Sequence, residues 1–145
     1  MGRDQARKIQ TLRDVALFSS SSTKELEQLA GLFDEVEISA GTVLMREGDH
    51  GREFYVISEG SATATLRGRL LATLGRGDFF GEMSLLERAP RAATVIAETD
   101  MELFVLDARG FSTLIERAPG VGARMMAGLA RRLRAIEQAP AAARA

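Results

Sequence analysis

Apolar residues recur at helical spacing near the beginning of the chain. Residues 4–18 predict a first helix, whose apolar face holds Ile9, Leu12, Val15 and Ala16. The "SSSS" stretch ends this helix. Ser22 and Glu25 then have the three-residue spacing of a capping box, which predicts the start of a second helix. The apolar stripe of this second helix is Leu26, Leu29 and Leu32.

In the middle of the chain the apolar period shortens and glycines become frequent. Seven short runs alternate like strands, at residues 33–39, 42–47, 53–60, 61–66, 69–74, 92–98 and 101–107. Turn residues, mostly glycine, separate them. Short strands at such regular spacing predict a mainly β protein with flanking helices, built as an antiparallel barrel or double-sheet roll.

Helical spacing returns after Leu106. Asp107 is the expected N-cap of a helix that starts at Ala108, and Pro119 opens a last helix. The stripe of that last helix is Met125, Leu129, Leu133 and Ile136. The predicted segments are therefore helices at 1–32, a roll at 33–106 with a distinctive stretch at 79–94, helices at 107–138 and a tail at 139–145.

Composition narrows the functional classes. The chain has 145 residues and a net charge of −1, so it lacks the basic field that attracts nucleic acid or an anionic membrane. It has no cysteine, and its apolar runs are far shorter than the roughly 20 residues that span a bilayer. We expect a cytoplasmic protein of one domain that inserts into no membrane and binds no nucleic acid.

Residues for catalysis are scarce. The one histidine, His50, lies in a turn-like stretch, and a lone loop histidine is usually a solvated residue. No serine has a histidine to activate it, so a hydrolytic triad is excluded, and neither a metal site nor a P-loop is apparent. Acidic residues are numerous enough for a paired-carboxylate hydrolase, but no pair stands out. The sequence indicates no cofactor and favours a binding protein over an enzyme.

The stretch "GEMSLLERAPRAAT", residues 81–94, places one acid and one arginine among small and apolar residues. Backbone N–H groups after Gly81 could bind an anion, and Arg91 offers a planar fork for two phosphate oxygens. Glu82 would repel a phosphate but could accept a bond from a neighbouring hydroxyl. This combination suits a nucleotide whose phosphate is tied to its own ribose. The alternative is an ordinary surface ion pair between Glu82 and Arg91.

The longer stretch "FFGEMSLLERAPRAAT" resembles the phosphate-binding cassette of cyclic-nucleotide-binding domains, as in protein kinase A regulatory subunits, catabolite activators and cyclic-nucleotide-gated channels. The resemblance continues through "AGTVLMREGDHGREFYVISEGSA" before it and "TDMELFVLDARGFSTLIERAPGV" after it, covering roughly residues 15–136. It implies a β-roll, or jelly roll (double-stranded β-helix), with N-terminal helices and C-terminal hinge and lid helices.

The resemblance also implies roles for individual residues. Gly81 and Glu82 would hold the ribose 2′-OH, and Arg91 with the backbone of Ala92 would hold the cyclic phosphate. Met83 and Ser84 would line the turn. Because cGMP-selective members often have threonine where this chain has Ala92, the expected ligand is cAMP rather than cGMP.

The nucleotide base would need a wall and a lid. Leu66 and Leu74 are candidates for the wall, or they belong to the core. On the last helix Arg132 lies where channel-type bacterial domains place an arginine over the purine. The alternative is a solvated face made of Arg131, Arg132 and Arg134.

The predicted function is thus a cyclic nucleotide sensor that moves its C-terminal helices and acts on an effector protein or a fused output domain. An alternative of another class is a roll that binds no nucleotide and serves interaction or oligomerisation. In that case the stripe Met125–Ile136 could pair with a second copy in a homodimer.

Overall fold

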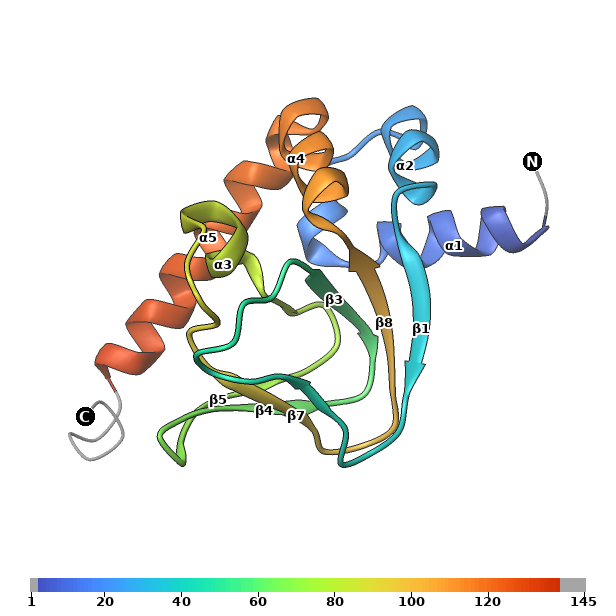
Figure 1. Cartoon of the computed structure of the whole chain (residues 1–145). Helices are drawn as coiled ribbons and strands as arrows, with labels where there is room; N and C mark the ends of the chain where they lie inside the picture. The colour runs from blue at the N-terminus through green and yellow to red at the C-terminus, as the bar shows by residue number, and fades with distance from the viewer. Residues whose placement is uncertain (1–2, 139–145) are drawn as a thin grey trace.

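Two four-stranded antiparallel sheets form the centre of the molecule (Figure 1). The computed structural model describes residues 3–138. One sheet has the order β1-β8-β3-β6 and the other the order β2-β7-β4-β5. The strands are β1 (Asp34–Ile38), β2 (Val43–Met45), β3 (Phe54–Glu59), β4 (Ala62–Leu66), β5 (Arg69–Leu74), β6 (Phe79–Phe80), β7 (Thr94–Ala97) and β8 (Met101–Leu106).

Helices come before and after the β strands in the sequence. The first group is α1 (Arg3–Arg13), the 3₁₀ helix η1 (Ala16–Phe18) and α2 (Thr23–Ala30). The second group is α4 (Ala108–Arg117) and α5 (Pro119–Glu137), and the short helix α3 (Glu82–Glu87) interrupts the strands. In Figure 1, α5 runs diagonally past α3 on the side of the roll away from β1. The predicted β-roll with helices at both ends is confirmed.

The sequence prediction differs from the structure in two elements. The helix expected at 4–18 ends at Arg13, because Val15 has an extended backbone (φ −83°, ψ 128°) before η1 begins. This break lets Leu17 and Phe18 turn into the core, where both are buried. Strand β6 was not predicted, since two residues are too few to show a period; it pairs with Tyr55 and Val56 of β3.

Strands β3 and β8 are largely buried on both of their faces. One face packs with the helices in a core that includes Phe54, Phe104 and Phe79. The other face fills the interior of the roll, where Ile57 and Leu103 meet side chains of the second sheet. Successive residues of a strand point to opposite faces, so Phe79 lies in the helical core while Phe80 lies inside the roll. Strand β6 is thus anchored in both cores.

The helix ends follow the sequence closely. Ser22 and Glu25 form the predicted capping box of α2, Asp107 caps α4 by accepting a bond from the N–H of Gly110 (2.7 Å), and Pro119 opens α5. The stripe on α5 is only partly covered. Met125 is buried, whereas Leu133 is 57% exposed.

The capping box offers a test of what holds α2 in place. We expect Ser22→Ala to lower the free energy of unfolding by about 1 kcal/mol, because the N–H of Glu25 loses its acceptor. Ser21→Ala is the matched control, since no side-chain bond of Ser21 is found in residues 3–138. Urea denaturation of both variants measures the difference, and equal midpoints would mean that the cap contributes nothing.

Candidate ligand-binding site

The cassette begins with a turn that only glycine can make. Gly81 follows β6 with φ 92°, the left-handed region. A Cβ there would lie 2.6 Å from the carbonyl oxygen of Glu53 and 2.9 Å from Nη1 of Arg91. The chain therefore leaves β6 in tight contact with β3 and with Arg91, and α3 starts at the next residue.

Arg91 is buried, with 4% of its surface exposed. Its Nη1 donates to the carbonyl oxygen of Gly81 (3.0 Å) and to Oγ of Ser84 (3.5 Å), and its Nη2 lies 3.3 Å from Oε2 of Glu53. The guanidinium carbon is also 5.9 Å from the ring centroid of Tyr55. These contacts fix the fork beside the first turn of α3.

Gly51 is a residue of the site that the sequence prediction missed. A Cβ on Gly51 would lie 2.0 Å from Nε and 2.3 Å from Cζ of Arg91. Any larger residue would thus displace the guanidinium. In the sequence Gly51 is only one of several turn glycines, and nothing local marks it as the neighbour of an arginine 40 positions later.

Glu82 is 2% exposed and forms an ion pair with Arg132 of α5 (Oε1 to Nη1, 3.0 Å). Arg91 instead pairs with Glu53. The alternative of a surface ion pair between Glu82 and Arg91 is therefore wrong, because both residues are buried and each has another partner. Burial raises the pKa of the Glu82 carboxyl, and the positive charge of Arg132 opposes that rise.

Arg132 connects α5 to the start of the cassette. Besides Glu82, it donates a bond from Nη2 to the carbonyl oxygen of Phe79 (2.5 Å), and its guanidinium lies 5.0 Å from the centroid of the Phe79 ring. The alternative of a solvated face is wrong for Arg132 but right for Arg131 and Arg134, which are exposed. The aromatic ring beneath Arg132 in this structure is a protein ring, where the sequence analysis expected a purine.

A cavity of about 370 Å³ lies between the cassette, the roll and α5. Seven of the predicted site residues line it: Gly81, Glu82, Met83, Ser84, Ala92, Arg132 and Leu74. Leu66 does not; it lies at the hairpin end of β4, where it pairs with Arg69. Arg91 does not line the cavity either, but it is bonded to Gly81 and Ser84, which do. The sequence analysis missed the other apolar walls, which are Met45, Ala64, Leu71, Ala72, Phe80, Ala93, Val95, Leu129, Leu133 and Ile136.

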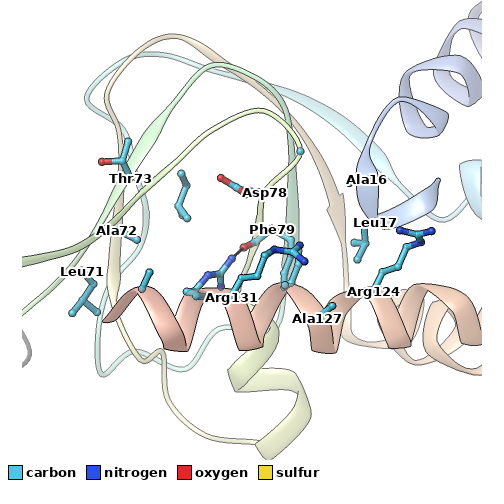
Figure 2. A pocket seen from close by; sticks show the side chains of 15 residues that line it. Ala16, Leu17, Leu71, Ala72, Thr73, Asp78, Phe79, Arg124, Ala127 and Arg131 are labelled. Carbon is cyan, nitrogen blue, oxygen red and sulfur yellow. Dashed lines mark hydrogen bonds between the residues drawn. The ribbon is translucent and has the colours of Figure 1, made fainter. Parts of the chain in front are cut away.

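A second cavity, of about 310 Å³, lies on the other flank of α5 (Figure 2). Figure 2 shows Arg124 and Arg131 extending from α5 toward this space, with Phe79 and Asp78 on the opposite wall. The two cavities share Arg132 and three residues of β5, namely Leu71, Ala72 and Leu74. Any displacement of α5 would therefore alter both.

Other kinds of site are not seen in the part of the chain that the structure describes. Between residues 3 and 138 no cluster of histidine and acidic side chains could hold a metal ion. In the same range no helix is both long enough and apolar enough to cross a bilayer.

Comparison with known proteins gives consistent matches. A family profile described as "Cyclic nucleotide-binding domain" matches residues 35–118. The chain is 37% identical over 106 residues to the cAMP-dependent protein kinase regulatory subunit of Aspergillus niger, covering 72% of this chain and 26% of that protein. The chain thus spans about a quarter of the length of such curated relatives.

Solved structures share the fold. The Thermus thermophilus catabolite activator protein has a TM-score of 0.72 and 36% identity, covering 81% of this chain and 58% of that one. The regulatory subunit of a cAMP-independent protein kinase A from Trypanosoma brucei has a TM-score of 0.76 and 28% identity, covering 85% and 46%. Each of these likenesses covers more than four-fifths of this chain.

The charge pair at the cavity makes a prediction about pH. We expect the Glu82 carboxyl to titrate above the usual pKa of a glutamate, and Arg132→Gln to raise that pKa further, because the nearby positive charge is lost. Since the folded protein then holds this proton more tightly than the unfolded chain, stability should fall as pH rises from the usual value toward the raised one.

Carbon-13 NMR of the glutamate carboxyl groups across a pH series measures the pKa of Glu82 in the native protein and in Arg132→Gln. Arg134→Gln removes an exposed charge from the same helix and should leave the Glu82 titration unchanged. A lower Glu82 pKa in Arg132→Gln than in the native protein would contradict the ion pair.

Proposed function

The chain belongs to the family of cyclic nucleotide-binding domains, and we propose that it binds cAMP in the cavity between the roll and α5. One observation carries the proposal: the buried carboxylate of Glu82 lines a largely apolar cavity, and the buried guanidinium of Arg91 is bonded to two other lining residues, Gly81 and Ser84. Isolated buried charges are costly, so proteins keep them mainly where they have a partner or a task. Here the pair matches the two polar parts of a cyclic nucleotide.

Arg91 is proposed to bind the cyclic phosphate. Its guanidinium is held by Gly81, Ser84 and Glu53, so it needs little ordering when a ligand arrives. A phosphate would be a stronger partner for Arg91 than the half-exposed carboxylate of Glu53, because it can accept two charge-assisted bonds from the guanidinium at once. The backbone N–H of Ala92, at the cavity wall, would donate to the same phosphate.

Glu82 is proposed to accept a bond from the ribose 2′-OH. A carboxylate has two oxygens and about four acceptor sites, so Glu82 can keep its bond to Arg132 and still take the hydroxyl. The ion pair with Arg132 also favours the charged form of the acid, which is the better acceptor. In this arrangement Arg132 acts on the ligand through Glu82.

The base would lie against the apolar part of the cavity, between Leu71 and Leu74 of β5 and Leu133 of α5. Ala92 has no hydroxyl to offer to a guanine. Because cGMP-selective members of the family often have threonine at this position, Ala92 supports cAMP as the ligand, and cGMP is the second choice. No metal or other cofactor is part of the proposal.

The domain is proposed to be regulatory rather than catalytic, and to act on a partner protein or on a fused output domain. Ligand contacts at Glu82 would change its ion pair with Arg132 and so the position of α5. An exposed surface of α5 that includes Met126 and Leu133 could then contact a partner differently. A ligand shifts such an equilibrium only by its differential affinity for the two positions. The Aspergillus niger relative, named as a protein kinase regulatory subunit, is a precedent for such a role.

The ligand itself needs a direct test, because the Trypanosoma brucei neighbour is described as part of a cAMP-independent kinase. We expect isothermal titration to give saturable cAMP binding, and Arg91→Ala to weaken it by about a hundredfold, equivalent to about 2.7 kcal/mol. Arg76→Ala removes an arginine from an exposed loop outside the cavity and should change nothing. Equal affinity of Arg91→Ala and the native protein would remove Arg91 from the site.

A second experiment isolates the role of Glu82. We expect the native protein to bind cAMP more tightly than 2′-deoxy-cAMP by roughly 1–3 kcal/mol, the cost of leaving a buried acceptor without its donor. Glu82→Gln should narrow that gap while keeping the shape of the side chain. If native protein binds the two ligands equally, Glu82 serves only to hold α5.

A further inference from the structure

A cleft of about 430 Å³ lies between α3, α4 and the loop before β3. Three segments far apart in the sequence form it: the loop before β3, the end of α3 and the first half of α4. Its lining residues are His50, Gly51, Arg52, Ser84, Leu85, Arg88, Ala89, Ala108, Phe111 and Ser112. Except for Gly51 and Ser84 these residues take no part in the site described above.

The cleft is basic. His50, Arg52 and Arg88 come from two different segments to line it, and no lining residue is acidic. None of these three side chains has a hydrogen bond or an ion pair within residues 3–138. By contrast, Arg91 and Arg132 each have a carboxylate partner.

Asp49 and Glu87, which adjoin the basic residues in sequence, do not line the cleft. Two further acids close in sequence are engaged elsewhere. Glu53 pairs with Arg91, and the carboxylate of Asp107 accepts the N–H of Gly110 as the cap of α4. The positive charge of the cleft therefore has no carboxylate partner among these neighbours. A concave surface with unpaired charges of one sign attracts ligands of the opposite sign.

The backbone of Arg88 adds an independent observation. Arg88 ends α3 with φ 53° and ψ 41°, a left-handed conformation that glycine or asparagine adopts at lower cost. The chain has an arginine there, and its side chain lines the cleft. A residue kept in a costly conformation is a candidate for a function of its side chain.

We propose that this cleft binds a small molecule with a phosphate or diphosphate group. Two guanidinium groups match the geometry of phosphate oxygens, and the imidazole of His50 and the hydroxyls of Ser84 and Ser112 are further donors. Leu85 and Phe111 give an apolar wall for the organic part of such a ligand. The volume lies within the usual range of small-molecule sites, about 300–1,000 Å³.

Pyrophosphate is a suitable probe, titrated at constant ionic strength into nitrogen-15-labelled protein and followed by amide NMR. We expect saturable shifts confined to the three segments of the cleft, at residues 50–52, 84–89 and 108–112. Arg88→Asn keeps a residue that tolerates the left-handed backbone but removes the charge, and Arg52→Ala removes the second guanidinium. Each should weaken binding at least tenfold, whereas the control Arg76→Ala should not.

The cassette is itself proposed to bind a phosphate, so the two sites must be separated. In an Arg91→Ala background the pyrophosphate shifts at residues 85–89 and 108–112 should persist and still saturate, although Gly51 and Ser84 of the cleft contact Arg91. Shifts at residues 81–83 and 91–93 that vanish in this background would place the anion in the first cavity and overturn the proposal. So would equal affinity in Arg88→Asn and Arg76→Ala, or shifts that never saturate, since both mean unspecific attraction. These outcomes do not depend on whether cAMP binds.

Discussion

The burial of Arg91 is the constraint on which the rest of the site depends. A guanidinium that is 4% exposed needs partners for its donors, and it finds them in a main-chain carbonyl, a serine hydroxyl and a glutamate. These contacts impose conditions on the chain. Gly81 must adopt a left-handed backbone, Gly51 must have no side chain, and the loop before β3 must bring Glu53 close to the cassette. The roll supplies these conditions by pairing β6 with β3.

A second buried charge gives the site its link to the C-terminal helix. Burial alone would favour the neutral form of Glu82, and Arg132 opposes this by reaching it from α5, 50 positions later. Removing one partner of such a pair leaves an uncompensated buried charge, and this destabilises the protein by more than the intact pair stabilises it. The acid and the helix are therefore coupled in this structure. A ligand that bonds to Glu82, as proposed above, would act on α5 through Arg132.

The sheet β1-β8-β3-β6 lets that coupling reach further. Its strands β8, β3 and β6 are packed on both faces, with helices against one side and the interior of the roll against the other. Phe79 and Phe80, next to each other in β6, belong to the two different cores, and Arg132 rests on the first of them. Close-packed interiors shift between discrete arrangements rather than deform smoothly. The cassette, the helices and the roll thus meet at two adjacent residues.

The sequence by itself determined the features that depend on neighbouring residues. Alternating apolar residues predicted seven of the eight strands, the capping box and Asp107 marked where α2 and α4 begin, and the spacing of Gly81, Glu82 and Arg91 identified the cassette. Only the tertiary structure decided which distant groups meet. It paired Arg91 with Glu53 and Glu82 with Arg132, put Leu71 rather than Leu66 at the cavity, and required glycine at position 51. The physical reason is that periodicity and capping are encoded within a few residues. An ion pair or a close approach instead depends on strand register and helix docking, which set the distances between segments about 40 to 50 positions apart.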